Sequence, residues 1–201
     1  MSSPDQLVGT RARLLAAART EFAAHGMGGA RVDRIARAAG ANKERIYGYF
    51  GSKEKLFAAV VAEAVEEHAA LLGPPAGDLG AYAGRVHDLH RANPELLRLM
   101  MWEALHHDSG ALPAGGERRA RYAGMVGSLA RTLGTAPDTR AAATFLAVLG
   151  IAVLPSAFPQ LARLIMGSVD GGEGAGDAET RAYIVELARR LAPGTALPET
   201  D

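Results

Sequence analysis

The chain has 201 residues, a formal net charge of zero, 48% hydrophobic residues, 24 glycines and 10 prolines. This composition excludes a fibrous or fully disordered chain and fits one or two small globular domains. The sequence contains no cysteine, which excludes disulfides and thiolate metal sites, and its first residues lack the apolar core of a signal peptide, so we expect a cytoplasmic protein.

Helical periodicity runs through nearly the whole chain, and no strand-like alternation of useful length interrupts it. In the first part, the spacing of apolar residues predicts helices over residues 10–25, 33–39, 43–49 and 53–72, with Gly26 as the first stop signal and Ser52 as the cap of the fourth helix. After a break at residues 73–80, helices are predicted over residues 82–92, 94–107, 117–133, 139–154 and 178–191. The sequence therefore predicts an all-α fold.

The net charge of zero conceals an uneven distribution of charge. Residues 1–55 contain ten basic and five acidic side chains, a balance of +5, and the remaining residues contain twelve and seventeen, a balance of −5. All three lysines, Lys43, Lys53 and Lys55, lie in the basic part, whereas the other 19 basic residues are arginines. Lysine is a compact point charge suited to phosphate, so the two parts are expected to face different partners.

The two short helices around Gly40 have the spacing of a helix-turn-helix. Ala36 stands where the two backbones approach, Gly40 where the turn needs a positive φ, and Ile46 where the second helix meets the first. The outward residues of the second helix are polar, cationic or small, which suits the major groove of DNA. An ordinary helical hairpin with a solvated face would show the same spacing.

A signature of glycine, aromatic and basic residues covers this hairpin and the start of the next helix. Its members are Gly40, Ile46, Tyr47, Tyr49, Phe50, Ser52, Lys53 and Leu56. This run resembles the tetracycline-repressor (TetR) family of bacterial transcriptional regulators, with a close match over about residues 10–57. The resemblance implies an N-terminal three-helix domain with a helix-turn-helix, residues 1–55, joined by a long helix to a C-terminal helical bundle. That bundle, residues 56–201, would bind a ligand and form the dimer.

The resemblance also implies a function and roles for individual residues. The expected protein is a regulator and not an enzyme: a homodimer that binds a palindromic double-stranded DNA operator, usually represses, and releases the operator when a small-molecule effector binds. Three residues fall where family members contact bases and three where they contact phosphates: Lys43, Arg45 and Gly48, then Tyr47, Tyr49 and Lys53.

Three positions depart from the family pattern, and one of them is Gly48, where members usually carry a side chain. Arg31 stands where members often have a hydroxyl that caps the second helix and contacts phosphate, and we expect the arginine to take over the phosphate contact. Glu44 replaces a small residue. It could accept a hydrogen bond from cytosine N4 or pair with a neighbouring arginine, and we favour the pairing.

The C-terminal part offers a candidate effector site and a candidate dimer interface. Methionines and aromatic residues provide an adaptable wall for a small apolar or aromatic effector, although residue type alone favours a core role for each of them. The predicted lining is Met101, Trp102, Leu105, Tyr122, Met125 and Phe145. Residues 139–154 are apolar almost all round, so we expect them to pack on their own bundle and, with residues 178–191, on a second subunit.

Histidine pairs raise the alternative of a metal site. His87 and His90 share one helical face, as do Glu103 and His106, and each pair could supply two ligands. Ordinary polar surface residues show the same spacing, so we expect neither a metal nor a cofactor.

Two further alternatives concern the membrane and the class of protein. The uncharged run 141–162 is long enough to cross a bilayer, but Gly150, Pro155 and Pro159 interrupt it, so a buried helix is expected. An all-α protein-interaction adaptor would explain the helices alone, and no nucleophile with a spaced base indicates an enzyme.

Overall fold

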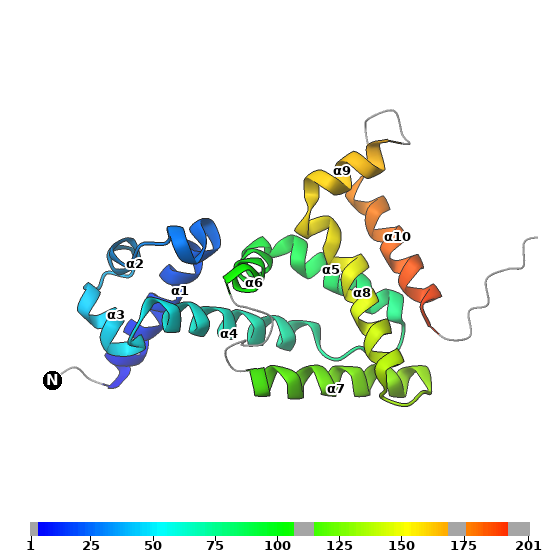
Figure 1. Cartoon of the computed structure of the whole chain (residues 1–201), viewed down its shortest axis with the longest axis horizontal. Helices are drawn as coiled ribbons and strands as arrows, with labels where there is room; N and C mark the ends of the chain where they lie inside the picture. Colours follow the sequence, from blue (N-terminus) through cyan, green and yellow to red (C-terminus); the bar gives the residue numbers. More distant parts are fainter. Residues whose placement is uncertain (1–3, 107–114, 169–175, 193–201) are drawn as a thin grey trace, which may run out of the picture. The chain divides into compact units, whose positions relative to one another are not determined.

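The computed structural model describes residues 4–106, 115–168 and 176–192, and within these ranges every regular element is an α-helix (Figure 1). This confirms the predicted all-α fold. The helices are α1 (Pro4–Gly29), α2 (Val32–Ala38), α3 (Lys43–Phe50), α4 (Lys53–Leu72), α5 (Leu79–Ala92), α6 (Pro94–His106), α7 (Gly115–Leu133), α8 (Thr139–Ala157), α9 (Pro159–Gly167) and α10 (Asp177–Arg190). They form two compact units: α1 to α3, α6 and α4 up to His68 in the first, and the remaining described residues in the second.

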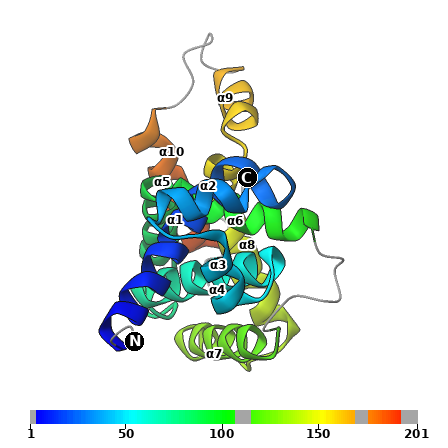
Figure 2. The same ribbon diagram turned by 90° about the vertical axis from the view of Figure 1, so that its left-hand side faces the viewer.

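The core of the first unit joins helices that are far apart in the sequence. Phe22 of α1 and Phe57 of α4 meet edge to face, with ring centroids 5.0 Å apart. Leu96 and Leu99 bring α6 into the same buried cluster. Full burial of a side chain of this size stabilises a fold by roughly 1.5–3 kcal/mol. The short helices α2 and α3 belong to the same unit (Figure 2), and Ile46 of α3 is part of the buried cluster.

The turn between α2 and α3 has the backbone that the sequence predicts. Gly40 has a φ of 61°, a conformation that costs glycine little. The Asn42 side chain then caps α3 by accepting the Arg45 backbone N–H at 3.0 Å. One helix later, the Ser52 hydroxyl accepts the Lys55 backbone N–H at 3.2 Å, which confirms the predicted cap of α4.

The first helix changes direction at its predicted stop. Gly26 has φ 64° and ψ −176°, a conformation essentially restricted to glycine. Helical turns then continue to Gly29, beyond the predicted end. The indole ring of Trp102 in α6 covers Gly26 so closely that a Cβ at Gly26 would lie 2.7 Å from a ring carbon. Both the backbone conformation and the packing therefore require glycine here.

The second unit is built around α5, which packs against α8 and α10. Tyr82 of α5 and Phe145 of α8 are buried with ring centroids 6.3 Å apart. Where α5 packs against α10, Gly80 lies so close that a Cβ at position 80 would be 2.5 Å from the Val185 carbonyl oxygen. A bidentate ion pair joins the two helices between Asp88 and Arg181 at 2.8 Å. Two further ion pairs, Asp78–Arg189 and Arg91–Asp177, extend this contact.

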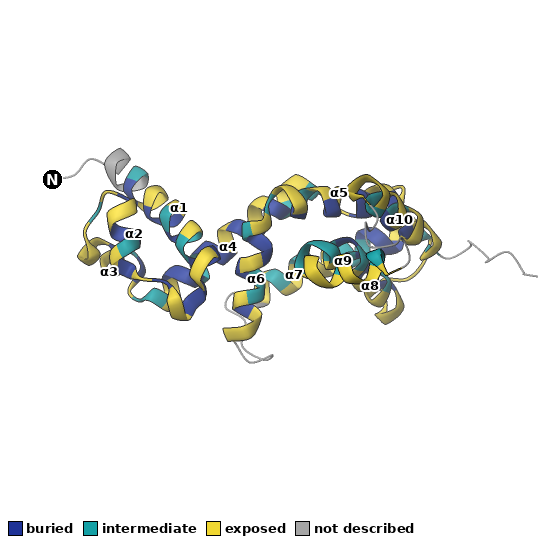
Figure 3. Ribbon diagram, turned by 90° about the horizontal axis from the view of Figure 1, so that it is seen from above, coloured by how far each residue is buried: buried dark blue, intermediate teal, exposed yellow. Residues whose placement is uncertain are grey.

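The region after residue 139 corrects the prediction in two ways. The helix α8 does not end at residue 154 but continues through Pro155 to Ala157, because a proline in the last turn removes only one backbone hydrogen bond. The helix α9 was not predicted at all. Pro159 begins it at a position that suits the fixed φ of proline, and α9 has no buried residue (Figure 3).

The helix α8 is long and apolar enough to cross a membrane by length and composition, which is weak evidence for a single helix. In the structure it is a bundle helix with one buried face, which contains Ala141, Phe145, Val148 and Ala152. Its opposite face is exposed, so the expectation of a helix buried within this chain holds for one side only.

Candidate nucleic-acid interface

The helix α3 presents one face to the core and the other to solvent. Ile46 and Phe50 are buried and anchor the helix, whereas the residues between them and before them are mostly exposed (Figure 3). The exposed positions include Lys43, Arg45 and Gly48, which are the three predicted base contacts. A helix held in this way can enter a major groove with its outer face, as helix-turn-helix proteins do.

The charged residues at the start of α3 differ in their partners. Lys43 Nζ lies 3.3 Å from Asp33 Oδ1 of α2, an exposed pair worth about 0–1 kcal/mol that a phosphate or base can replace. Within the described ranges, the side chains of Arg45 and Glu44 make no ion pair. The favoured pairing of Glu44 with a neighbouring arginine is therefore not observed. The guanidinium of Arg45 is available to an acceptor outside the described chain.

The predicted phosphate contacts lie around the C-terminal end of α3 and the start of α4. Tyr47 is 43% exposed, and Tyr49 is half-buried against Phe50. Lys53 is the first residue of α4, where unbonded backbone N–H groups favour anions. Glu54 in the same turn interacts with the Ser52 hydroxyl, which lowers the pKa of the Glu54 carboxyl and keeps a negative charge beside Lys53.

A carboxylate from α1 holds the start of α2, where the N-cap residue Arg31 makes no side-chain cap hydrogen bond. Glu21 accepts the Arg31 backbone N–H at 2.8 Å and the Arg34 Nε–H at 2.7 Å. Burial alone would raise the pKa of Glu21, but the hydrogen bonds from Arg34 and Arg31 hold this pKa below its ordinary value. The Arg31 side chain itself stays exposed. Sequence analysis missed Glu21 because its partners lie ten and thirteen residues away.

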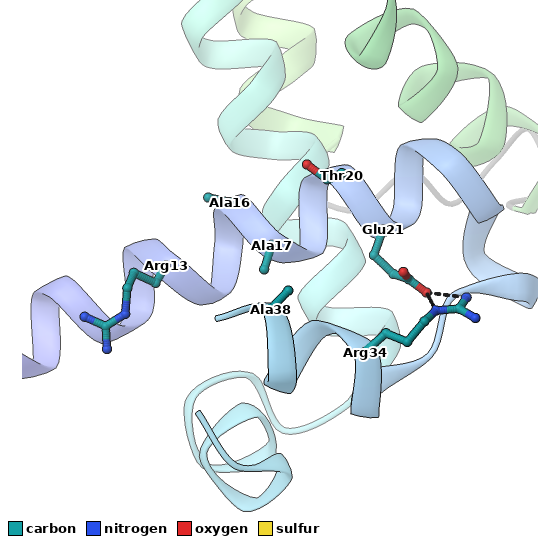
Figure 4. Close-up of a pocket in the computed structure, with 7 residues that line it drawn as sticks. All are labelled: Arg13, Ala16, Ala17, Thr20, Glu21, Arg34 and Ala38. Atoms are coloured by element: carbon teal, nitrogen blue, oxygen red, sulfur yellow. Dashed lines mark hydrogen bonds and ion pairs between the residues drawn. The ribbon is translucent and has the colours of Figure 1, made fainter. Parts of the chain in front are cut away.

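An open pocket of about 470 Å³ lies between α1 and α2 beside this carboxylate (Figure 4). Arg13, Ala17 and Thr20 line it from α1, and Arg34 and Ala38 line it from α2. The Glu21–Arg34 ion pair, with a shortest distance of 2.6 Å, crosses one end and neutralises the arginine there. The pocket therefore carries no unpaired charge at that end, and its remaining wall is largely made of alanine.

The six predicted effector-binding residues divide between the two units. Met101, Trp102 and Leu105 belong to α6 in the first unit, where Trp102 covers Gly26 and Leu105 is 77% exposed. Tyr122 and Met125 of α7 belong to the second unit, and so does Phe145, which is buried against Tyr82.

The histidine pairs likewise divide between the units. Within the described residues, no group of three potential metal ligands is found. His87 is buried with its ring Nδ1 3.3 Å from Asp88 Oδ1. Burial lowers the pKa of His90 because it penalises the charged imidazolium.

Comparisons with known proteins agree over most of the chain. Residues 14–60 match the family described as "Bacterial regulatory proteins, tetR family", and residues 78–190 match "Tetracyclin repressor-like, C-terminal domain". The HTH-type transcriptional repressor SCO4008 from Streptomyces coelicolor is 38% identical over 185 residues, which cover 90% of this chain and 94% of the relative.

Solved structures show the same architecture. SCO4942 from Streptomyces coelicolor is 34% identical with a TM-score of 0.73, and the match covers 92% of this chain and 98% of that one. A transcriptional regulator from Rhodococcus sp. Rha1 shares the fold at 23% identity with a TM-score of 0.65, over 90% of this chain and 95% of the regulator.

Proposed function

Because this chain belongs to the tetracycline-repressor family of bacterial regulatory proteins, we propose that it is a ligand-responsive transcriptional repressor. It binds a palindromic double-stranded DNA operator as a homodimer in the cytoplasm and leaves the operator when a small apolar or aromatic effector binds. Residues 1–55 bind DNA, and residues 56–201 bind the effector and form the dimer. The observation that carries the proposal is the exposed face of α3, on which the exposed Arg45 side chain makes no ion pair within the described ranges.

The proposed assignment of base contacts and phosphate contacts to residues of α3 and α4 follows from side-chain chemistry. The fork of Arg45 can donate to guanine O6 and N7 together, a contact worth about 1–3 kcal/mol of discrimination. Lys43 reaches a base after exchanging its weak pair with Asp33. Lys53 binds phosphate with its own charge and the free N–H groups of α4, and this contact carries no sequence information. Tyr47, Tyr49 and Arg31 contribute further phosphate contacts.

The proposed dimer uses the exposed apolar faces of α8 and α10. Leu146 and Leu154 of α8 are 71% and 51% exposed, and Tyr183 and Leu187 of α10 are 48% and 49% exposed. Apolar side chains that recur on the solvent face of two helices in the same unit indicate a protein interface. Gly150 lies between the two leucines, and nothing in the described chain stands within 4 Å of where its Cβ would be. A partner helix can therefore approach α8 closely.

The proposed effector contacts Met101, Trp102, Leu105, Tyr122, Met125 and Phe145. Trp102 is the single tryptophan of the chain and is 37% exposed, so its emission is a direct probe of this region. Quenching or a shift of Trp102 emission on effector binding supports the assignment. Unchanged emission with saturating effector contradicts it.

The proposal is tested by selecting double-stranded DNA from a random pool with the purified protein. We expect a palindrome whose affinity falls steeply with salt. Arg45→Ala should then lose affinity for the selected site while changing little on scrambled DNA, and Lys53→Ala should weaken both alike. Arg119→Ala, an exposed arginine of α7, is the matched control and should bind as the original chain does. Recovery of no preferred sequence contradicts the proposal.

A further inference from the structure

The fold does not explain why residue 48 is a glycine. Gly48 lies in the interior of α3 with right-handed helical geometry, unlike its neighbours Gly40 and Gly51, which have φ values of 61° and 79°. Glycine inside a helix costs up to about 1 kcal/mol relative to alanine. A Cβ at Gly48 would meet nothing within 4 Å. Neither the backbone nor the packing of the described chain therefore requires glycine at this position.

Gly48 belongs to the face of α3 that points to solvent. It follows Glu44 by four residues and Arg45 by three, so the three positions share one side of the helix. One turn beyond Arg45, at Gly48, no side chain covers the backbone of α3, and this part of the backbone is exposed to solvent. Because nothing in the described ranges offsets the cost of this glycine, we look for its advantage in what this face of α3 contacts.

We propose that Gly48 is a specificity-determining residue of the DNA-binding surface. Its missing side chain lets the backbone of α3 lie directly against base edges in the major groove, and even a methyl group at this position holds the helix away. This inference rests on the proposed function, in which α3 enters the groove. The depth of the helix decides whether Arg45 reaches a base, since hydrogen bonds weaken steeply beyond donor–acceptor distances of about 3.2 Å.

The test compares Gly48→Ala with Gly124→Ala. Gly124 is also an exposed glycine inside a helix, α7, with nothing within 4 Å of its Cβ position. Both variants should be at least as stable as the original chain in urea, because alanine favours helix. Fluorescence anisotropy then gives their affinity for the selected operator and for a scrambled duplex.

We expect Gly48→Ala to weaken operator binding by about tenfold or more, the scale of a lost bidentate base contact, and to change scrambled DNA little. Gly124→Ala should bind both as the original chain does. In the Arg45→Ala background, Gly48→Ala should cost much less, because the contact that depends on helix depth is already absent.

Three results overturn the inference. Undiminished operator binding by Gly48→Ala shows that a side chain is tolerated. Equal losses on operator and scrambled DNA show that the helix backbone meets phosphates and not bases. Lower stability of Gly48→Ala shows a role within the fold. Failure of the proposed function itself is distinguishable, because the unaltered chain would then show no sequence preference before any variant is compared.

Discussion

Replacement of Gly26 by alanine tests how α1 and α6 are joined in the first unit. The φ of 64° and ψ of −176° at Gly26 lie in a region that costs a residue with a Cβ about 1–3 kcal/mol. The new Cβ would also lie 2.7, 2.8 and 2.9 Å from three ring carbons of Trp102. Overpacking of this kind costs typically about 1–3 kcal/mol. Gly26→Ala should therefore lower the free energy of unfolding by about 2–6 kcal/mol.

A double-mutant cycle separates the two contributions. In the Trp102→Ala background the steric part disappears, so Gly26→Ala should cost only the backbone part, about 1–3 kcal/mol. Urea unfolding followed by circular dichroism measures all four chains, since tryptophan emission is lost in two of them. Gly28→Ala is the control, because nothing lies within 4 Å of its Cβ position and its φ is not positive. A coupling between Gly26 and Trp102 within about 0.5 kcal/mol of zero refutes the reasoning.

Three further predictions concern the other contacts described above. Glu21→Gln should lower the free energy of unfolding by about 1–3 kcal/mol, since the partly buried carboxylate that holds Arg34 is lost. Because the folded-state pKa of Glu21 is below its ordinary value, this stabilisation is present above about pH 4.5 and is lost as the pH falls through the folded pKa. Urea unfolding above and below this pH should show that the stability difference between the original chain and Glu21→Gln becomes smaller in acid. A stability difference that does not change with pH argues against this role of Glu21. Gly80→Ala should lower the free energy of unfolding by about 1–3 kcal/mol, because its Cβ would collide with the Val185 carbonyl oxygen, and the midpoint of thermal unfolding should fall accordingly. An unchanged midpoint contradicts the close contact of α5 and α10. Gly150→Arg should leave the fold intact, because its side chain enters open space, but should give a monomer in sedimentation; a dimer that persists contradicts the proposed interface.

Local patterns in the sequence were enough to predict most of the helices and the turn at the candidate site. Apolar spacing placed α1 to α4 to within a few residues, apart from the first residues of α1, because the hydrophobic face of each helix repeats with the helical period. Positive φ at Gly40 and the stop at Gly26 followed from the freedom of glycine. The prediction failed at α8 and α9, where prolines were interpreted as interruptions. A proline within the last turn or at the first position of a helix is compatible with that helix, and local sequence does not separate these cases.

Contacts between residues distant in the sequence were decided only by the tertiary structure. Glu21 on another helix accepts the backbone N–H of Arg31, the N-cap residue of α2, Lys43 pairs with Asp33, and Glu44 has no ion pair within the described ranges. The sequence by itself determined the helical class, the helix-turn-helix and the family, since these depend on residue types at fixed local spacings. Which charges are paired, which glycines are covered and which apolar faces remain exposed depends on how the helices pack, and packing joins residues that no local spacing relates.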